Sequence, residues 1–257
     1  MRDSESGWIR LHPGEFFLLW SSLGLGEPPA VLGIPHIGRT RAARAEFERT
    51  ADAGLSEREL GTVSRPDRDL AGMLRAVAGA DVLLDMSAEW AGPEFRAVGA
   101  VLGQQCVTVG VSGTELRIGP VRGSALVSTM LAAVPELPAG HGAPANVRAA
   151  DYAAACAAGR RDGTNGFSDS LRSAGLRPAE VNTLVRAVTG RAGGGQFGGG
   201  CRGRGGRWSR GAGSVNWVDT EQGRFALSRT GDWVTATPAD PARLRTMVEQ
   251  LAADLIG

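Results

Sequence analysis

The chain has 257 residues, of which 42% are hydrophobic and 21% are charged, and its formal net charge is +1. This composition is ordinary for a globular protein and is enough for one large domain or two modest ones. The near-zero net charge gives no reason to expect a nucleic acid or a membrane surface as the partner of the whole chain.

The three cysteines, Cys106, Cys156 and Cys201, lie far apart in the sequence. Their odd number and the lack of a CxxC pair argue against a disulfide framework and against a thiolate zinc site. The first residues lack the basic-then-apolar layout of a signal peptide, and no apolar run reaches the roughly 18 residues that a membrane helix needs. We therefore expect a soluble protein of the cytoplasm.

The first half of the sequence predicts helices, then strands, then a helix. Helical spacing of apolar residues together with proline or capping residues predicts helices that begin at Pro13, Thr40, Ser56 and Asp67. Strand-like runs begin at Asp81, Glu94, Cys106 and Glu115. A helix is expected over residues 123–134.

The second half follows a segment rich in Pro, Gly and Ala, residues 135–147, which predicts a linker because it offers nothing to bury. Helices are then expected from Ala149, Phe167 and Pro178. Three short strands separated by EQG and RTGD turns follow, and Asp240 and Pro241 begin a last helix.

Two similar segments begin 111 residues apart: LRAVAGADVLLDM at Leu74 and VRAVTGRAGGGQF at Val185. Each is followed by strand-like runs and then by an amphipathic helix, which indicates an internal repeat. We predict an α+β fold with a shared antiparallel sheet and helices collected at its two ends. The chain is expected to form one domain, 1–257, with pseudo-repeat halves at about 13–134 and 148–257.

The glycine run at residues 193–200 raises the possibility of a phosphate loop. Such a loop needs a strand before it, a helix after it and usually a Lys-Ser/Thr pair. Here a helix comes before, strands come after, and the chain contains no lysine. The run therefore favours a strand, at a sheet edge, that approaches another backbone closely.

An Arg/Gly-rich loop covers residues 202–210 and contains Arg202, Arg204 and Arg207. No acidic residue occurs from Arg191 to Val218, so the loop could attract phosphates. A solvated hairpin loop is the alternative interpretation. A nucleic-acid-binding module that uses this loop is the second candidate function.

The sequence offers no set of catalytic residues. Asp219 and Glu221 flank a turn and have no nearby residue to complete an acid/base site. His12, His36 and His141 lie in loops rich in Pro and Gly, and no GxSxG or HExxH motif is present. We expect no enzyme, no cofactor and no metal site.

Three segments of the second half carry a family resemblance: GGGQFG (193–198), SVNWVDTEQGRF (214–225) and WVTATPADPARL (233–244). LGLGEPPAVL and DRDLAGMLRAVAGADVLLDM in the first half fit the same pattern. With these motifs in this order, the chain resembles, from about Gly14 to its C-terminus, the EspG family. This family comprises cytoplasmic chaperones of type VII (ESX) secretion in actinobacteria.

The resemblance implies a non-catalytic protein with a central antiparallel sheet flanked by two helical bundles that are related by a quasi-twofold. It also implies binding to the apolar helical tip of a PE–PPE heterodimer or a related helical type VII substrate. The chaperone would keep that client soluble and aid its delivery to the ESX machinery, and would be a monomer or homodimer when free of client.

The resemblance places partner binding on the sheet and the C-terminal helical bundle. By position, the residues expected at this surface are Trp217, Phe225, Leu227, Trp233, Met247 and Leu251. A Trp217→Ala substitution is then expected to weaken client binding without unfolding the protein, because an exposed Trp is a frequent binding hot spot.

Overall fold

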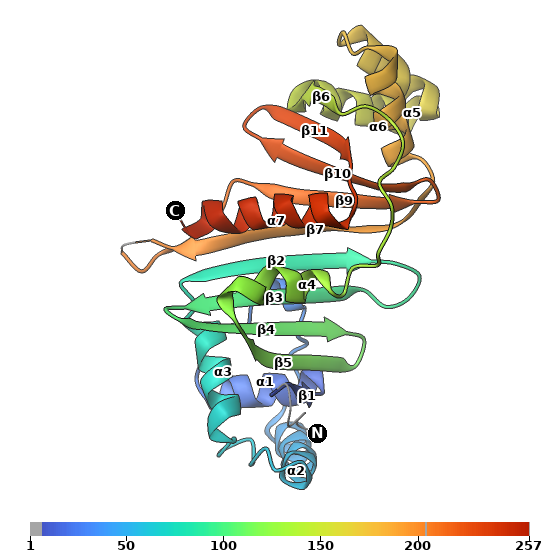
Figure 1. The fold of residues 1–257 in the computed structure, drawn as a ribbon. Helices are drawn as coiled ribbons and strands as arrows, with labels where there is room; N and C mark the ends of the chain where they lie inside the picture. Colours follow the sequence, from blue (N-terminus) through green and yellow to red (C-terminus); the bar gives the residue numbers. More distant parts are fainter. Residues whose placement is uncertain (1–6, 204, 257) are drawn as a thin grey trace. The chain divides into compact units, whose positions relative to one another are not determined.

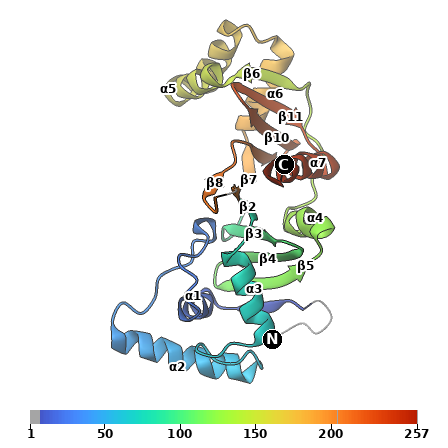
Figure 2. The same ribbon diagram turned by 90° about the vertical axis from the view of Figure 1, so that its left-hand side faces the viewer.

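The computed structural model describes residues 7–203 and 205–256 (Figures 1 and 2). The chain divides into two compact units. The first unit comprises the described parts of Met1–Ser87, Pro93–Met130 and Gly200–Ser209. The second comprises the described parts of Ala88–Gly92, Leu131–Gly199 and Arg210–Gly257. Each unit therefore includes a short segment from the other half of the sequence.

The first unit is an antiparallel sheet with helices. Its strands lie in the spatial order β1-β5-β4-β3-β2. They are β1 (Ile9–Leu11), β5 (Glu115–Val121), β4 (Gln105–Ser112), β3 (Phe95–Leu102) and β2 (Val82–Glu89). The last two residues of β2 belong to the second unit. Its helices are α1 (Pro13–Ser22), α2 (Arg41–Glu57), α3 (Arg68–Ala78) and α4 (Leu126–Leu131, of which Leu131 belongs to the second unit). Two short 3-10 turns are η1 (Ala30–Leu32) and η2 (Gly123–Ala125).

The helices of the first unit cover both faces of its sheet (Figure 2). Val98 of β3 and Val109 of β4 pack with the apolar sides of α1 and α3 in one core. The next residue along β3, Gly99, points to the opposite face, because side chains alternate along a strand. A Cβ at Gly99 would lie 2.7 Å from Leu126 and 2.9 Å from Met130, so α4 covers this second face at close range.

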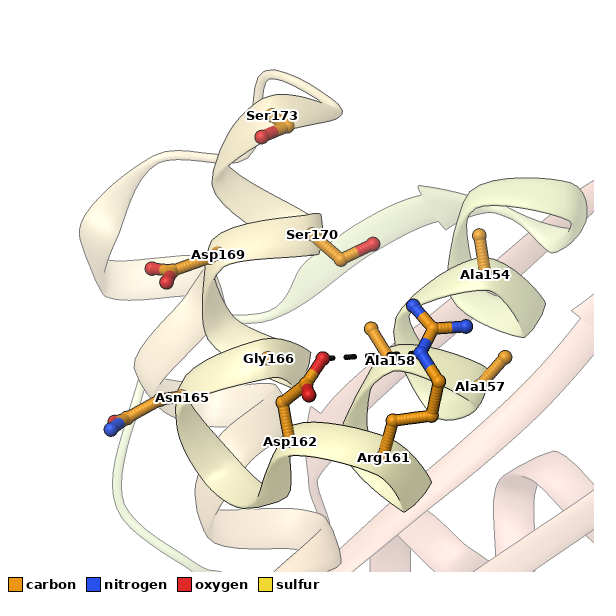
Figure 3. A pocket seen from close by; sticks show the side chains of 10 residues that line it. All are labelled: Ala154, Ala157, Ala158, Arg161, Asp162, Asn165, Gly166, Asp169, Ser170 and Ser173. Atoms are coloured by element: carbon orange, nitrogen blue, oxygen red, sulfur yellow. Dashed lines mark ion pairs between the residues drawn. The ribbon is translucent and has the colours of Figure 1, made fainter.

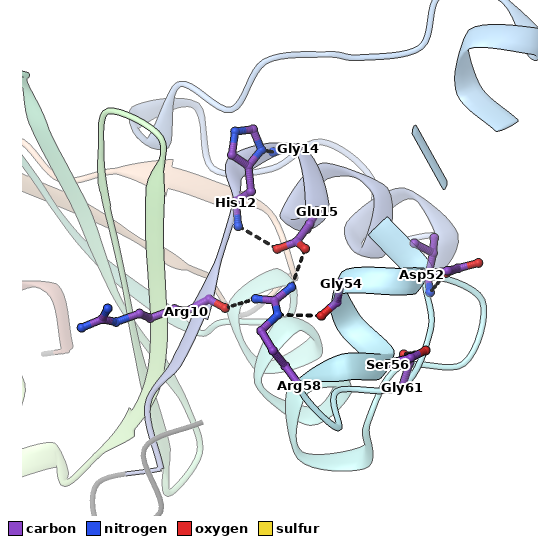
Figure 4. A network of polar contacts seen from close by, with 10 residues as sticks. Arg10, His12, Gly14, Glu15, Asp52, Gly54, Ser56, Arg58 and Gly61 are labelled. Carbon is purple, nitrogen blue, oxygen red and sulfur yellow. Dashed lines mark hydrogen bonds and ion pairs between the residues drawn. The ribbon is translucent and has the colours of Figure 1, made fainter. Parts of the chain in front are cut away.

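A polar network ties β1, α1 and α2 together (Figure 4). The guanidinium of Arg58 forms an ion pair with Glu15 and donates to the backbone carbonyls of Arg10 (2.8 Å) and Gly54 (2.7 Å). Glu15 also accepts from the backbone N–H of His12 and completes a capping box at the start of α1. This network fixes the end of α2 against the edge of the sheet.

The second unit has the same plan. Its main strands lie in the spatial order β7-β9-β10-β11-β6. They are β7 (Arg191–Arg202), β9 (Ser214–Thr220), β10 (Gly223–Thr230), β11 (Trp233–Pro238) and β6 (Ala145–Arg148). Residues Gly200–Arg202 of β7 belong to the first unit. A short strand, β8 (Trp208–Arg210, of which Trp208 and Ser209 belong to the first unit), pairs with β7. The helices are α5 (Ala149–Ser173), α6 (Pro178–Val188) and α7 (Pro241–Ile256).

The two units confirm the predicted internal repeat. Reading across the sheets, β1, β5, β4, β3 and β2 of the first unit correspond to β6, β11, β10, β9 and β7 of the second. In each unit a helix leads directly into the strand at one end of this order, α3 into β2 and α6 into β7, and a helix follows the last strand. The α+β fold class with antiparallel sheets and helices is confirmed.

Three local predictions change in detail. No separate helix forms over Ser56–Gly61: α2 continues to Glu57, and Ser56 lies within its last turn. The last residues of the expected linker form β6, in which Ala145 and Val147 are buried. The break expected after the Ala-rich helix is a kink inside α5, where Gly163 has a φ of 67°.

Candidate functional site

The structure places the six residues expected at a partner surface in different environments. Trp217 (1% exposed), Phe225 (0%) and Leu251 (6%) are buried in the described chain. Leu227 and Met247 are partly buried, whereas Trp233 is 47% exposed. In this conformation, Trp233 is the member of the set with a large surface open to a partner.

The six residues also do not share one face of the second unit. Leu227 packs with Val234 and Ala236 against α5 and α6 on one face of the sheet. Leu227 and Ala236 are cross-strand partners, and so are the next residues along the two strands, Ala226 and Thr237. Because side chains alternate along a strand, Ala226 and Thr237 face the other way. Trp217 and Trp233 lie on this second face, while Phe225 lies with Leu227.

The second face is covered in part by α7. Leu244, Val248, Leu251 and Leu255 form the buried stripe of α7 at helical spacing. Leu251 and Leu255 reach the chain just before β9, where a Cβ at Gly213 would lie 3.1 Å from Leu251. Figure 1 shows α7 running along β7 and β9, with the β10–β11 hairpin extending beyond it.

Beyond α7, two cross-strand rows remain accessible. One row consists of Thr230, Trp233 and Arg148, and the next consists of Ser228, Thr235 and Asn146. We call these six residues the open face. All six are exposed or partly exposed, although the opposite side of the same strands is buried under α5 and α6.

Specific polar contacts order the open face. The guanidinium carbon of Arg148 lies 5.1 Å from the ring centroid of Trp233, a cation–π arrangement. The hydroxyl of Thr235 donates to the side-chain oxygen of Asn146 at 2.7 Å. The face therefore combines an exposed indole and a cation with neighbouring hydroxyl and amide groups, which suits protein recognition more than chemistry on a substrate.

A buried cluster lies farther along the same face. Asp219 and Arg224 form a two-pronged ion pair, with N–O distances of 2.6 and 3.1 Å. Trp90 donates its indole N–H to Asp219 at 2.9 Å, and Arg224 donates to the carbonyl of Pro135 at 2.8 Å. These bonds hold the turn after β2 and the start of the linker on the second unit.

Sequence reasoning noted Asp219 but missed Arg224 and Trp90. A signal was available for Arg224, because strand alternation around the EQG turn places it directly opposite Asp219. Trp90 could not be found in this way, since it lies 129 residues from Asp219. Trp217 lies between Trp90 and Phe197, with ring centroids 6.5 and 5.4 Å away, and is thus a core residue.

The glycine run is a strand that approaches other groups closely, as predicted. The expected position at a sheet edge is wrong, because β7 lies between two strands in the sheet order. A Cβ at Gly193 would lie 2.4 Å from the ring of Trp90, and one at Gly194 would lie 2.4 Å from the carbonyl of Trp217. Gly194 also has a φ of +147°. These contacts explain the glycines by packing rather than by phosphate binding.

Arg202 of the Arg/Gly loop is bonded within the protein. Arg202 donates to the carbonyls of Ala78 and Ala80 at the end of α3 and to Gly206 in its own loop. These bonds satisfy carbonyls that a helix end leaves unpaired. Arg207 is exposed, while Arg204 lies outside the described residues. The loop thus supports α3, and nothing here specifies a nucleic acid.

A shallow hollow of about 730 Å³ lies between the two arms of the kinked α5 (Figure 3). Small residues line one arm, and Asn165, Asp169 and Ser170 line the other. Arg161 and Asp162 form an ion pair of 3.9 Å at the bend.

On the inner side of α5, burial and the nearby Cys156 raise the pKa of Tyr152 to about 12, so Tyr152 is neutral at ordinary pH.

Within the described residues, no group of three or more His, Cys, Asp or Glu side chains is placed to hold a metal ion. None of the described helices is both long enough and apolar enough to cross a membrane.

Two α+β units have the same strand order, and part of one sheet, around Trp233, is exposed outside the covering helices. These features define an internally duplicated α+β protein. The EspG family model matches residues 12–250, and the chain belongs to this family. No curated protein sequence matches the chain.

A solved structure is also similar to this chain, that of the Mycobacterium tuberculosis type VII secretion system chaperone EspG5 in complex with a PE25–PPE41 dimer. The TM-score is 0.78 with 19% sequence identity, and the match covers 96% of each chain. At this identity the likeness establishes the shared fold.

Proposed function

We propose that this protein is a type VII secretion chaperone that binds a PE–PPE-type pair, or a related helical substrate, and keeps it soluble for delivery. The observation that carries the proposal is the match to the EspG family over nearly the whole chain, residues 12–250. The similarity to EspG5, which was solved with a PE25–PPE41 dimer, supports the same client class. The protein acts as a binder rather than a catalyst and works in the cytoplasm.

The exposed Trp233 and its neighbours supply a surface of the right kind for this role. An apolar helix tip needs a few desolvated contacts to be shielded from water, and an exposed Trp on a rigid sheet provides one. Because Trp217, Phe225 and Leu251 are buried, we propose that they support this surface rather than contact the client. Met247 remains a proposed contact at the margin of this surface. Leu227 lies on the opposite face, packed against α5 and α6, and is proposed as a supporting residue.

Co-expression tests the function. The chain would be produced with each PE–PPE-type pair of its own genome, and complexes would be isolated by size-exclusion chromatography. A complex with one pair, stable in salt that strips nucleic acid from proteins, supports the chaperone function. A helical secretion substrate of another type is the control. Separate elution of every pair would overturn the proposal, and RNA retention lost at moderate salt would favour the Arg/Gly loop.

A further inference from the structure

The open face carries a cation whose charge the described chain does not neutralise. Arg148 lies over the Trp233 ring, and no carboxylate of the described residues forms an ion pair with it. Asp151 is near Arg148 in the sequence, and Asp232 is near it in space, since its carbonyl accepts from the N–H of Ala149 at 2.8 Å. Neither carboxylate forms an ion pair with the guanidinium of Arg148. Arg148 therefore retains its donors for an outside group, since a guanidinium can donate five N–H bonds.

Local stability does not account for an arginine at this position. Arg148 is the N-cap residue of α5, and its side chain makes no capping bond. Ser, Thr, Asp or Asn is favoured there, and a positive charge at a helix N-terminus is disfavoured by the helix dipole. A residue that breaks a local rule is a candidate for a role in binding, and the contact of Arg148 with the Trp233 ring leaves its N–H donors available.

The register places Arg148 and Trp233 as one unit. They are direct cross-strand partners on β6 and β11, so both side chains leave the sheet on the same side. Thr230 continues this row on β10, while Asn146 and Thr235 flank it. A partner that covers Trp233 with an apolar side chain must bring its next polar group close to Arg148.

We propose, on the basis of the proposed function, that the client docks on the open face. An apolar side chain of the client packs on Trp233, and a neighbouring carboxylate of the client pairs with Arg148. The occupant is thus an acidic-apolar segment of a helical secretion substrate. Stacking on Trp233 preorients the planar guanidinium, which favours a two-pronged bond to a carboxylate. Client choice then depends on the acidic residue as well as on the apolar tip.

The test uses the full chain and the PE–PPE-type pair that it captures in co-expression, with affinity measured by titration calorimetry. Arg148→Glu is expected to weaken binding at least about tenfold, and Trp233→Ala about tenfold or more. Arg49→Glu, an exposed arginine of α2 in the first unit, makes the same charge change and should leave affinity within about twofold.

A charge exchange gives the decisive result. Each Asp or Glu at the client tip would be changed to Arg, and one such client should lose affinity for the unchanged chain and regain it with Arg148→Glu.

Wild-type affinity in both Arg148→Glu and Trp233→Ala would overturn the inference but leave the chaperone function standing. No complex with the unchanged chain overturns both. A homodimer that Trp233→Ala dissociates would assign the face to a second copy and also overturn it.

Discussion

The carboxylate of Asp219 and the guanidinium of Arg224 face each other across the hairpin between β9 and β10, joined by bonds of 2.6 and 3.1 Å. Both side chains are almost fully buried, at 3% and 1% exposure. Burial of two charges costs solvation energy that is recovered when their remaining atoms are also bonded. Trp90 and the carbonyl of Pro135 supply those additional bonds.

Arg224→Met should therefore lower the free energy of unfolding by about 3–5 kcal/mol, since it leaves the Asp219 carboxylate buried without its cation. Arg224→Met combined with Asp219→Asn should cost less than Arg224→Met alone, because no buried charge remains. Urea unfolding measures both. Arg229→Met, an exposed arginine on the same strand, is the control and should change stability by about 0.5 kcal/mol or less. Equal effects of Arg224→Met and the control would contradict this account.

Trp217→Ala should destabilise the protein by about 3–5 kcal/mol, since it empties a packed site between Trp90 and Phe197. This reverses the expectation from sequence that Trp217→Ala would affect binding alone. Trp233→Ala removes an exposed ring and should change stability by about 1 kcal/mol or less. Thermal and urea unfolding of the two variants, measured side by side, check the contrast. Similar stabilities would show that Trp217 is not part of the core.

Two glycines should respond to alanine in opposite directions. Gly223 has a φ of +108°, and a Cβ there would lie 2.7 Å from the Pro138 carbonyl, so Gly223→Ala should cost about 1–3 kcal/mol. Gly72 lies inside α3, where a Cβ would meet nothing within 4 Å. Gly72→Ala should raise stability by about 0.5–1 kcal/mol through helix propensity. Calorimetric melting of each variant provides the measurement, and a shift of the same sign in both would be inconsistent with the structure.

The start of α6 predicts a dependence of stability on pH. Hydrogen bonds from the Arg177 side chain and backbone lower the pKa of Glu180 from 4.5 to about 2. A carboxylate with a lowered pKa in the folded state stabilises the protein fully above its unfolded value of about 4.5. That contribution is lost as pH falls from about 4.5 towards 2.

Glu180→Gln should remove this part of the pH dependence, and urea unfolding at pH 7 and pH 3 gives the comparison. Glu249→Gln, an exposed carboxylate on α7, is the control. If both variants followed the wild-type pH profile, the ion pair between Arg177 and Glu180 would not contribute to stability in solution.

Arg202→Ala should lower the melting temperature, because the carbonyls of Ala78 and Ala80 lose their donor. The free energy of unfolding should fall by about 1 kcal/mol. Arg207→Ala changes an exposed arginine of the same loop and should leave stability unaltered. Heparin retention of both variants separates structure from binding. Equal, marked losses of retention would mean that the loop is a polyanion site.

Much of the fold follows from local signals in the sequence. Asp67 caps the helix that it was expected to cap, and the helix expected from about Thr40 begins at Arg41. The alternation from Val215 to Thr237 gives three strands with EQG and RTGD turns. The repeat beginning at Leu74 and Val185 corresponds to equivalent helix–strand pairs, α3–β2 and α6–β7. These features depend on short-range chemistry that a single sequence carries.

The candidate surface was harder to predict, because alternation tells which residues share a face but not what covers that face. Trp217 and Trp233 share a face, and only the structure shows that Trp90 packs on the first while the second remains exposed. Arg148 gave no signal, since β6 was read as the end of a linker. Its pairing with Trp233 spans 85 positions (233 − 148) and belongs to tertiary structure.

The segments Ala88–Gly92 and Gly200–Ser209 each belong to the unit formed mainly by the other half of the sequence. A polypeptide severed between residues 135 and 147 would give two fragments that are both incomplete. The N-terminal fragment would lose Arg202 and leave the carbonyls at the end of α3 unpaired, and the C-terminal fragment would lose the indole of Trp90 that donates to Asp219. Despite its duplicated plan, the protein cannot be separated into two self-sufficient parts at its linker.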